Sequence, residues 1–166
     1  MGHSSVKTIS LIAILTALTV GMSLLVVIPI PNTKGMVTLC EVGIFTSAIL
    51  FKNPVGFSVG AISGFLIDII SGFPVWCLFS LVIHGLEGFV VAYLVPKEDK
   101  SIKKIILPLL LGSIIMVVGY CLATILLFGI AAGLASIIGN IFQVVFGLVV
   151  TLLIVKSLAR FSRVIN

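Results

Sequence analysis

Charged residues are scarce in this chain. Only 9% of its 166 residues are charged, whereas about a quarter are charged in a soluble globular domain. In contrast, 60% of the residues are hydrophobic and the mean hydropathy is +1.41. The composition therefore excludes a soluble globular domain. It also excludes a disordered chain, which requires low hydrophobicity. The sequence predicts an integral membrane protein.

Motifs for soluble chemistry are also lacking. The sequence contains no P-loop or other nucleotide-binding motif. Its cysteines, Cys40, Cys77 and Cys121, stand singly, without the spacing of a metal cage or a disulfide framework. We interpret them as small apolar residues and predict no cofactor, no metal site and no catalytic residue. The net charge of +5 reports membrane topology rather than nucleic-acid binding.

Apolar stretches, separated by proline, glycine and polar residues, predict an all-α protein with six transmembrane helices. A spanning helix needs about 20 apolar residues, so the chain has room for about six in a single transmembrane domain, residues 1–166. Proline marks the ends of the first four, because it cannot donate the helical hydrogen bond. The expected helices are residues 8–28, 37–51, 55–71, 75–95, 105–128 and 134–156, and residues 29–36 are expected to form a loop.

Lysine and arginine residues are distributed unevenly about these helices. With six spans, the two termini and the second and fourth loops share one side of the membrane. That side carries nine of the ten basic residues, and the other side carries only Lys34. Because basic residues accumulate in cytoplasmic loops, we expect both termini in the cytoplasm and the first, third and fifth loops outside.

Small residues recur at every fourth position on the first, third and sixth of the expected helices, and on the sixth, at positions 131, 135 and 139, we interpret them as internal packing. They let helices approach closely in lipid. The glycines of the third helix, at positions 56, 60 and 64, are interpreted as internal packing. On the first helix, Ala13, Ala17 and Gly21 form a similar row, which could equally well contact another protein chain.

Polar side chains within the expected helices are the candidate functional residues, because ionisable groups are costly at membrane depth. With a rise of about 1.5 Å per residue, most of them fall in the outer half of the membrane, which favours a cavity open to the outside. The candidates within the helices are Glu41, His84, Glu87, Tyr120, Asn140 and Gln143, and Asn32 and Trp76 of the outer loops could cover the cavity. Asp68 lies at a similar depth, but it could cap its helix or pair with Lys34.

Several readings of these residues remain open. His84 and Glu87 lie one turn apart and could satisfy one another, and Asn140 and Gln143 could hydrogen-bond between helices. A channel is disfavoured, because the inner half of the membrane carries almost no polar residue. A small proton-coupled antiporter centred on Glu87 is an alternative function.

Three segments carry a resemblance to a known family. They are VTLCEVG at residues 37–43, GAISGFLID at residues 60–68 and IHGLEG at residues 83–88. Together with six short helices and the Ala13-x-x-x-Ala17 pattern, they resemble an S-component of an energy-coupling factor (ECF) vitamin transporter. The resemblance covers nearly the whole chain.

The resemblance implies a transport subunit rather than an enzyme, located in the bacterial cell membrane. S-components capture a vitamin or vitamin precursor from outside. They dock on a transmembrane coupling protein, the T-component, and on two cytoplasmic ATPases that hydrolyse the ATP. Ala13 and Ala17, extended by Gly21, match the helix signature that contacts the coupling protein. Glu41, His84, Asn140 and Gln143 lie at depths that suit the substrate pocket.

The side chains of the expected pocket favour one class of substrate. Carboxamides complement the mixed donor and acceptor edge of a small heteroaromatic ring, and an aromatic side chain can stack on it. Apart from Lys156 at the cytoplasmic end of the last one, no lysine or arginine lies within the expected helices, which disfavours an anionic ligand. We expect hydroxymethylpyrimidine or pyridoxine, between which the sequence does not choose. An S-component for a transition metal is the other alternative.

Overall fold

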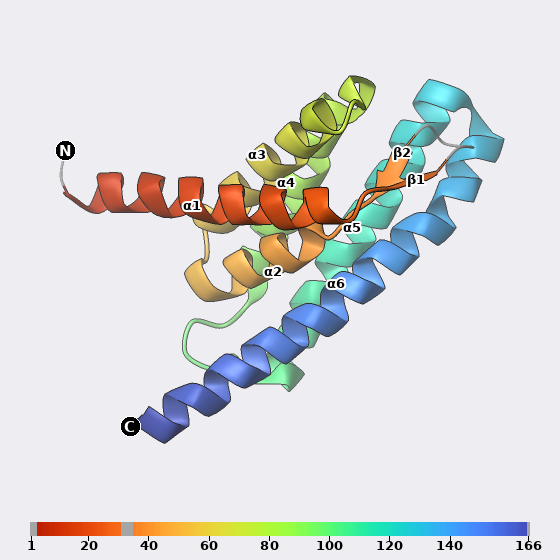
Figure 1. The fold of residues 1–166 in the computed structure, drawn as a ribbon. Coiled ribbons are helices and arrows are strands. Elements are labelled where there is room, and N and C mark those ends of the chain that lie inside the picture. Colours follow the sequence, from red (N-terminus) through yellow and green to blue (C-terminus); the bar gives the residue numbers. More distant parts are fainter. Residues whose placement is uncertain (1–2, 31–34, 166) are drawn as a thin grey trace.

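The computed structural model describes residues 3–30 and 35–165, and the side chains of residues 5–30 and 35–158. Most of these residues are helical (Figure 1). The helices are α1 (His3–Leu25), α2 (Cys40–Phe51), α3 (Val55–Ile70), α4 (Cys77–Leu94), α5 (Ile102–Phe128) and α6 (Ile130–Ile165), with the 3-10 turn η2 (Pro74–Trp76) before α4. Two short strands, β1 (Ile28–Ile30) and β2 (Gly35–Val37), connect α1 to α2.

Four helices in the described part of the chain are long and apolar enough to cross a membrane. These segments are Ser5–Leu25, Pro74–Leu94, Ile102–Phe128 and Ile130–Leu158. The helices α2 and α3 are apolar but shorter, with 12 and 16 residues, or about 18 and 24 Å of helix. The hydrocarbon layer is about 30 Å thick. The chain is thus a helical multi-pass membrane protein with two helices of less than full spanning length.

The segment expected as a loop, residues 29–36, is partly a β-hairpin. Strands β1 and β2 pair antiparallel, with Ile28 opposite Val37 and Ile30 opposite Gly35. Proline at position 29 is compatible with this pairing, because a two-stranded ribbon has only edge strands and does not need every N–H. The hairpin takes residues that the sequence assigned to helix, so α2 begins at Cys40 instead of residue 37.

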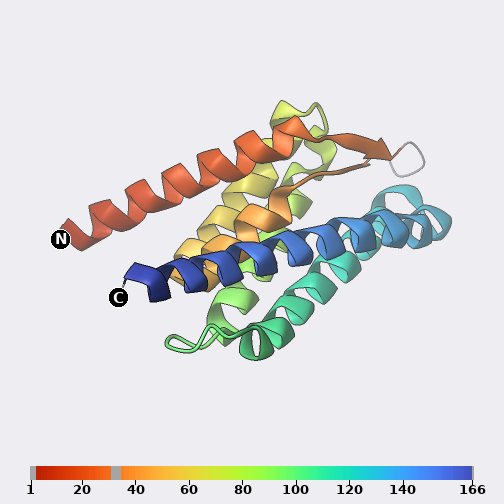
Figure 2. The same ribbon diagram turned by 60° about the horizontal axis from the view of Figure 1, so that its bottom comes forward.

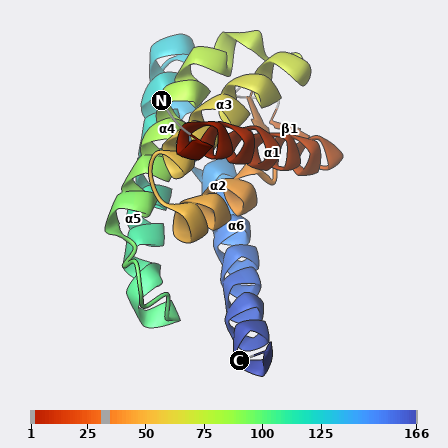
Figure 3. The same cartoon turned by 90° about the vertical axis from the view of Figure 1, so that its left-hand side faces the viewer.

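Helices α2 to α6 form a closed ring. Each of them packs against the next along the chain, and α6 returns to pack against α2. Helix α1 lies outside this ring, against α2 and α3. Helix α6, with 36 residues, is longer than the expected residues 134–156, and its C-terminal part extends away from the other helices (Figure 3).

Glycine brings α3 and α4 into close contact. A Cβ atom on Gly56 would lie 2.8 Å from the backbone oxygen of Gly88, and one on Gly64 would lie 2.8 Å from the backbone oxygen of Ser80. A Cβ on Gly60 would collide with the backbone oxygen of His84. The glycine row at positions 56, 60 and 64 therefore packs inside the protein and fixes the position of His84.

The two termini lie at one end of the bundle, and the hairpin and the junction between α5 and α6 lie at the other (Figure 2). Basic residues tie two loops together at the end with the termini. Lys52 donates to the backbone oxygen of Val95, and Lys100 donates to that of Leu50 over 3.3 Å. In the same region, the hydrogen bond from Lys104 lowers the pKa of Asp99 to about 2.

Candidate ligand-binding site

A cavity lies between the β1–β2 hairpin and the parts of helices α2 to α6 that are nearest to it. It contains about 540 Å³ of space not filled by atoms, including the part that opens to solvent. The hairpin, η2 and helices α2 to α6 all contribute to its wall. The polar and aromatic lining residues are Thr38, Cys40, Asp68, Trp76, His84, Tyr120, Thr124, Ser136, Asn140 and Gln143.

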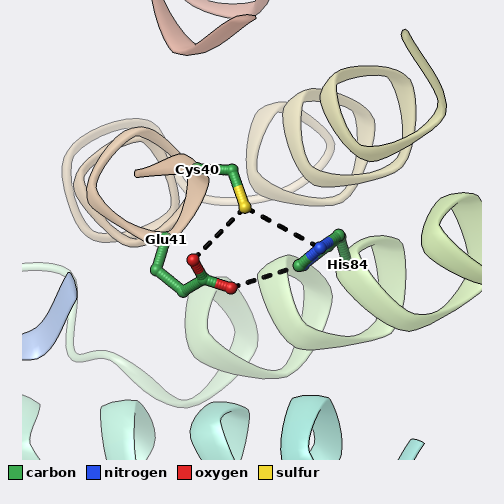
Figure 4. A group of neighbouring side chains, drawn as sticks. All are labelled: Cys40, Glu41 and His84. Atoms are coloured by element: carbon green, nitrogen blue, oxygen red, sulfur yellow. Dashed lines mark hydrogen bonds and ion pairs between the residues drawn. The ribbon is translucent and has the colours of Figure 1, made fainter. Parts of the chain in front are cut away.

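Three buried side chains, two of which line this cavity, point toward one another (Figure 4). Cys40 and Glu41 come from the first turn of α2, and His84 comes from α4. The sulfur of Cys40 lies 3.2 Å from Oε2 of Glu41 and 3.8 Å from Nε2 of His84. Nδ1 of His84 lies 3.8 Å from Oε1 of Glu41. The start of α2 thus meets the middle of α4 through polar contacts rather than apolar packing.

Hydrogen bonds extend this group in two directions. Nδ1 of His84 is 2.8 Å from Oε2 of Glu87, one turn further along α4. On the other side, Gln143 of α6 donates from Nε2 to Oε1 of Glu41 over 2.9 Å. The backbone N–H of Thr38 donates to Oε1 of Gln143 over 2.7 Å. This backbone donor fixes the orientation of the Gln143 amide, so that its NH₂ group faces Glu41.

An aromatic group forms the other side of the site. The hydroxyl of Tyr120 lies 3.0 Å from Nε2 of His84 and 2.5 Å from the hydroxyl of Ser80. The Trp76 ring packs against Tyr120, Phe79 and Phe128, with centroid distances of 5.9, 6.3 and 5.8 Å. Trp76 is only 3% exposed. The tryptophan is therefore held by other rings at the mouth of the helical ring.

Two polar atoms in the residues that line the cavity have no partner. They are Oδ2 of Asp68, near the end of α3, and Nδ2 of Asn140 on α6. The two residues are only 5% and 7% exposed. A buried polar group without a hydrogen bond is rare in folded proteins. The cavity thus holds an unused acceptor and an unused donor.

Cys40, Glu41 and His84 also form a set that could hold a metal ion. Each offers one ligand atom, and these atoms lie within 4.8 Å of one another. Thiolate, imidazole and carboxylate together suit zinc or a similar transition metal. The contact of His84 with Glu87 resembles the carboxylate that commonly orients a ligating histidine.

The structure separates the predicted site residues into two groups. Trp76, His84, Tyr120, Asn140 and Gln143 line the cavity. Glu41 and Glu87 do not line it; both are fully buried behind it and contact His84. Asn32 lies outside the described residues. Cys40, which the sequence indicated to be a small apolar residue, makes polar contacts with Glu41 and His84, and its position next to Glu41 was a signal. The sequence left Asp68 as a cap or a partner of Lys34, and Lys34 lies outside the described residues.

The small residues of α1 lie on an open surface. Ala13, Ala17 and Gly21 are exposed, and a Cβ atom on Gly21 would have nothing within 4 Å. The opposite face of α1 is buried and carries Thr16, Thr19 and Ser23. The row of small residues is therefore not used for packing within the described part of the chain.

The chain is similar to one family over nearly its whole length and to two known proteins over most of it. Residues 3–160 match the family described as "ECF-type riboflavin transporter, S component". The chain is 35% identical over 150 residues to the thiamine precursor transporter HmpT of Lactococcus lactis subsp. cremoris, which covers 90% of this chain and 86% of that protein. It is 37% identical over 128 residues to an uncharacterized protein from the gap 3′ region of Pyrococcus woesei, which covers 77% of this chain and 85% of that protein.

Proposed function

Since the chain belongs to the S components of ECF-type riboflavin transporters, a family of transport subunits and not of enzymes, we propose that it captures hydroxymethylpyrimidine for import. The observation that carries this proposal is the cavity. It offers an imidazole, a phenol and two carboxamides beside a buried indole. The Lactococcus relative is a thiamine precursor transporter, and hydroxymethylpyrimidine is a thiamine precursor, which supports this choice of substrate.

The orientation in the membrane follows from the distribution of charge. All 166 residues form one transmembrane domain with six spans in a bacterial cell membrane. The termini and the loops carrying Lys52 and Lys100 face the cytoplasm, in line with the excess of basic residues at that end. The cavity and the hairpin then face outside. The two short helices reach across only together with the segments that flank them.

Within the cavity, His84, Tyr120, Asn140 and Gln143 contact the substrate, and Trp76 stacks on its ring. Glu41 and Glu87 are positioning residues, since they hold His84 and Gln143 from behind. Asn32, which lies outside the described residues, is proposed as a further substrate contact from its position in the sequence alone. Hydrogen bonds that fix the rotamers of contacting side chains reduce the cost of binding, because fewer groups must be ordered when the ligand enters.

Delivery to the cytoplasm requires partner proteins. The exposed face of Ala13, Ala17 and Gly21 docks on the transmembrane coupling protein, whose two cytoplasmic ATPases supply the energy. Small residues favour such contacts, because they allow helix backbones to approach closely within lipid. The openness of this face supports the assignment.

Mass spectrometry of small molecules released from the purified protein tests the substrate. Calorimetry with hydroxymethylpyrimidine, pyridoxine, thiamine and riboflavin then ranks the candidates. We expect a bound pyrimidine and a preference for hydroxymethylpyrimidine. Tight binding of riboflavin or pyridoxine instead would overturn the substrate assignment. If the protein binds none of these four compounds but binds protons or cationic drugs, the antiporter alternative would be favoured.

A transition metal is the second candidate substrate, because Cys40, Glu41 and His84 bring three donor atoms together. Calorimetry with Zn²⁺, Co²⁺ and Ni²⁺ on the wild-type protein and on a Cys40→Ser variant tests it. Metal binding that depends on Cys40, in a protein that binds no vitamin, would establish this alternative.

A further inference from the structure

Asp68 places an unused acceptor in the cavity. It lies one turn after Gly64 on α3, and Gly64, Ile67 and Asp68 all line the cavity. Its Oδ2 atom is buried and has no hydrogen-bond partner. An oxygen atom in such a place has lost its hydration without gaining a hydrogen bond, which is costly unless a partner arrives. Because a ligand donor would recover part of this desolvation free energy, Asp68 is a strong hydrogen-bond acceptor for a ligand.

Asn140 places an unused donor in the same cavity. Its side chain comes from α6, so the two groups lie on different walls. Nδ2 of Asn140 is buried and unpartnered, and a carboxamide offers N–H groups to any acceptor that comes within reach. The other polar lining residues differ, because His84, Tyr120 and Gln143 already have partners within the protein.

The ligand that satisfies both atoms must carry a donor and an acceptor on one small body. An ionised carboxylate only accepts, so the ligand must present an N–H or O–H group to Asp68. Asn140 must find a ring nitrogen or a hydroxyl oxygen. An aminopyrimidine has both, since its exocyclic amine donates and the ring nitrogens accept. Pyridoxine lacks the amine and offers only hydroxyl donors.

We infer that Asp68 and Asn140 recognise the substrate's aminopyrimidine edge, with Asp68 accepting from the exocyclic amine and Asn140 donating to a ring nitrogen. The inference rests on the proposed function and narrows it, because it assigns the exocyclic amine of the substrate to Asp68, a place that pyridoxine could fill only with a hydroxyl group. Asp68 is then a specificity-determining residue in addition to those chosen from the sequence. The open end of the cavity provides the route by which the ring reaches it.

The experiment compares two ligands that differ by one group. They are hydroxymethylpyrimidine and the same ring without the exocyclic amine, measured by calorimetry on the full chain in detergent. We expect the wild-type protein to bind the amine-bearing ring about 10-fold or more tightly, as for a hydrogen bond to a buried charge. Equal affinity of the wild-type protein for both rings would overturn the inference without any variant.

Two variants on α3 separate recognition from packing. Asp68→Asn should weaken binding of hydroxymethylpyrimidine by about 10-fold or more and leave binding of the amine-free ring unchanged. The matched control is Ser63→Ala. Ser63 is buried on the same helix and its hydroxyl is also unpartnered, but it is not among the residues that line the cavity. This control should bind both rings like the wild type.

A third variant, Asn140→Ala, should weaken both rings equally, because both carry the ring nitrogens. Equal loss of both ligands in Asp68→Asn, accompanied by a lower melting temperature, would assign Asp68 a purely structural role and overturn the inference. The failure of the proposed function is distinguishable, since a wild-type protein of normal melting temperature would then bind neither ring.

Discussion

At the residue scale, the hydroxyl of Tyr120 joins two polar groups on α4. It lies within hydrogen-bond distance of His84 and of Ser80. Tyr120→Phe removes only this hydroxyl and leaves the ring against Trp76. We expect about 2- to 10-fold weaker substrate binding, since one neutral hydrogen bond is worth about 0.5–1.5 kcal/mol. Calorimetry measures the change.

Tyr93→Phe is the control for this substitution. Tyr93 is 73% exposed on α4 and stacks on Phe89 through its ring, which phenylalanine retains. Its affinity for the substrate should equal that of the wild type. A Tyr120→Phe protein that binds equally well would remove this hydroxyl from the site.

Glu41 gives a second prediction at this scale. Its carboxylate accepts from Gln143 and lies next to Cys40 and His84. Glu41→Ala leaves the Gln143 amide without this acceptor, so we expect about 10-fold weaker binding. Because Glu41 does not line the cavity, the loss should be the same for every ligand tested. A loss confined to one ligand would instead indicate direct contact.

The sequence predicted the polar residues of the site better than their partners. Residue type and helical depth sufficed to select His84, Glu87 and Gln143. The bond from Thr38 to Gln143 joins residues 105 apart in the chain, so no local pattern could predict it. Cys40 was misjudged, because a single cysteine in an apolar helix is ordinarily a small apolar residue. The polar contact of Cys40 with His84 exists only because α4 packs against α2, which the local sequence does not reveal.

At the scale of the elements, the α3–α4 contact predicts the effect of Gly60→Ala. The added methyl group would collide with the backbone oxygen of His84, so α3 and α4 must separate. We expect a loss of stability of about 1–3 kcal/mol, as for overpacking in a core, together with weaker substrate binding. Thermal unfolding in detergent and calorimetry measure the two effects.

Gly21→Ala on α1 is the matched control, since its methyl group would meet nothing within 4 Å. It should keep the melting temperature and the affinity of the wild type. If Gly60→Ala also kept both, then α3 and α4 would not be as closely packed as described.

Helix α1 gives the second prediction at this scale. Ala17→Trp places a large ring on the exposed row of small residues. We expect uptake into cells or proteoliposomes with the partner subunits to fall about 10-fold or more, as expected if about 1.4 kcal/mol of docking energy is lost. Substrate binding by the isolated protein should not change. Leu107→Trp is the control, because Leu107 is 62% exposed on α5, away from this row.

The local sequence predicted the number of helices but not all of their ends. Proline and glycine punctuation located the breaks near residues 53, 72 and 129. The hairpin escaped detection because it consists of two strands of three residues each, with proline in the first. Such short strands carry too few positions for an alternating pattern, and they form only because they pair with each other.

At the scale of the whole molecule, the arrangement of the ends predicts membrane topology. In a protein whose Cys40, Cys77 and Cys121 are replaced by alanine, single cysteines at Glu98 and Val75 would lie at opposite ends of the bundle, and both side chains are exposed. In intact cells, a membrane-impermeant thiol reagent should label Val75→Cys and leave Glu98→Cys unlabelled. Both should react after the membrane is permeabilised. The reverse pattern would invert the proposed orientation.

Helix α1 has one more consequence. The residues that line the cavity come from the hairpin, η2 and α2 to α6, and none of the described residues of α1 is among them. Mutations that change the ligand specificity therefore need not alter the exposed row of small residues on α1 that is proposed to contact a partner. The ligand specificity of such a protein can therefore change during evolution while its partner-binding surface stays the same. A chimera that combines this α1 with helices α2 to α6 of a related protein would test how far the two parts are interchangeable.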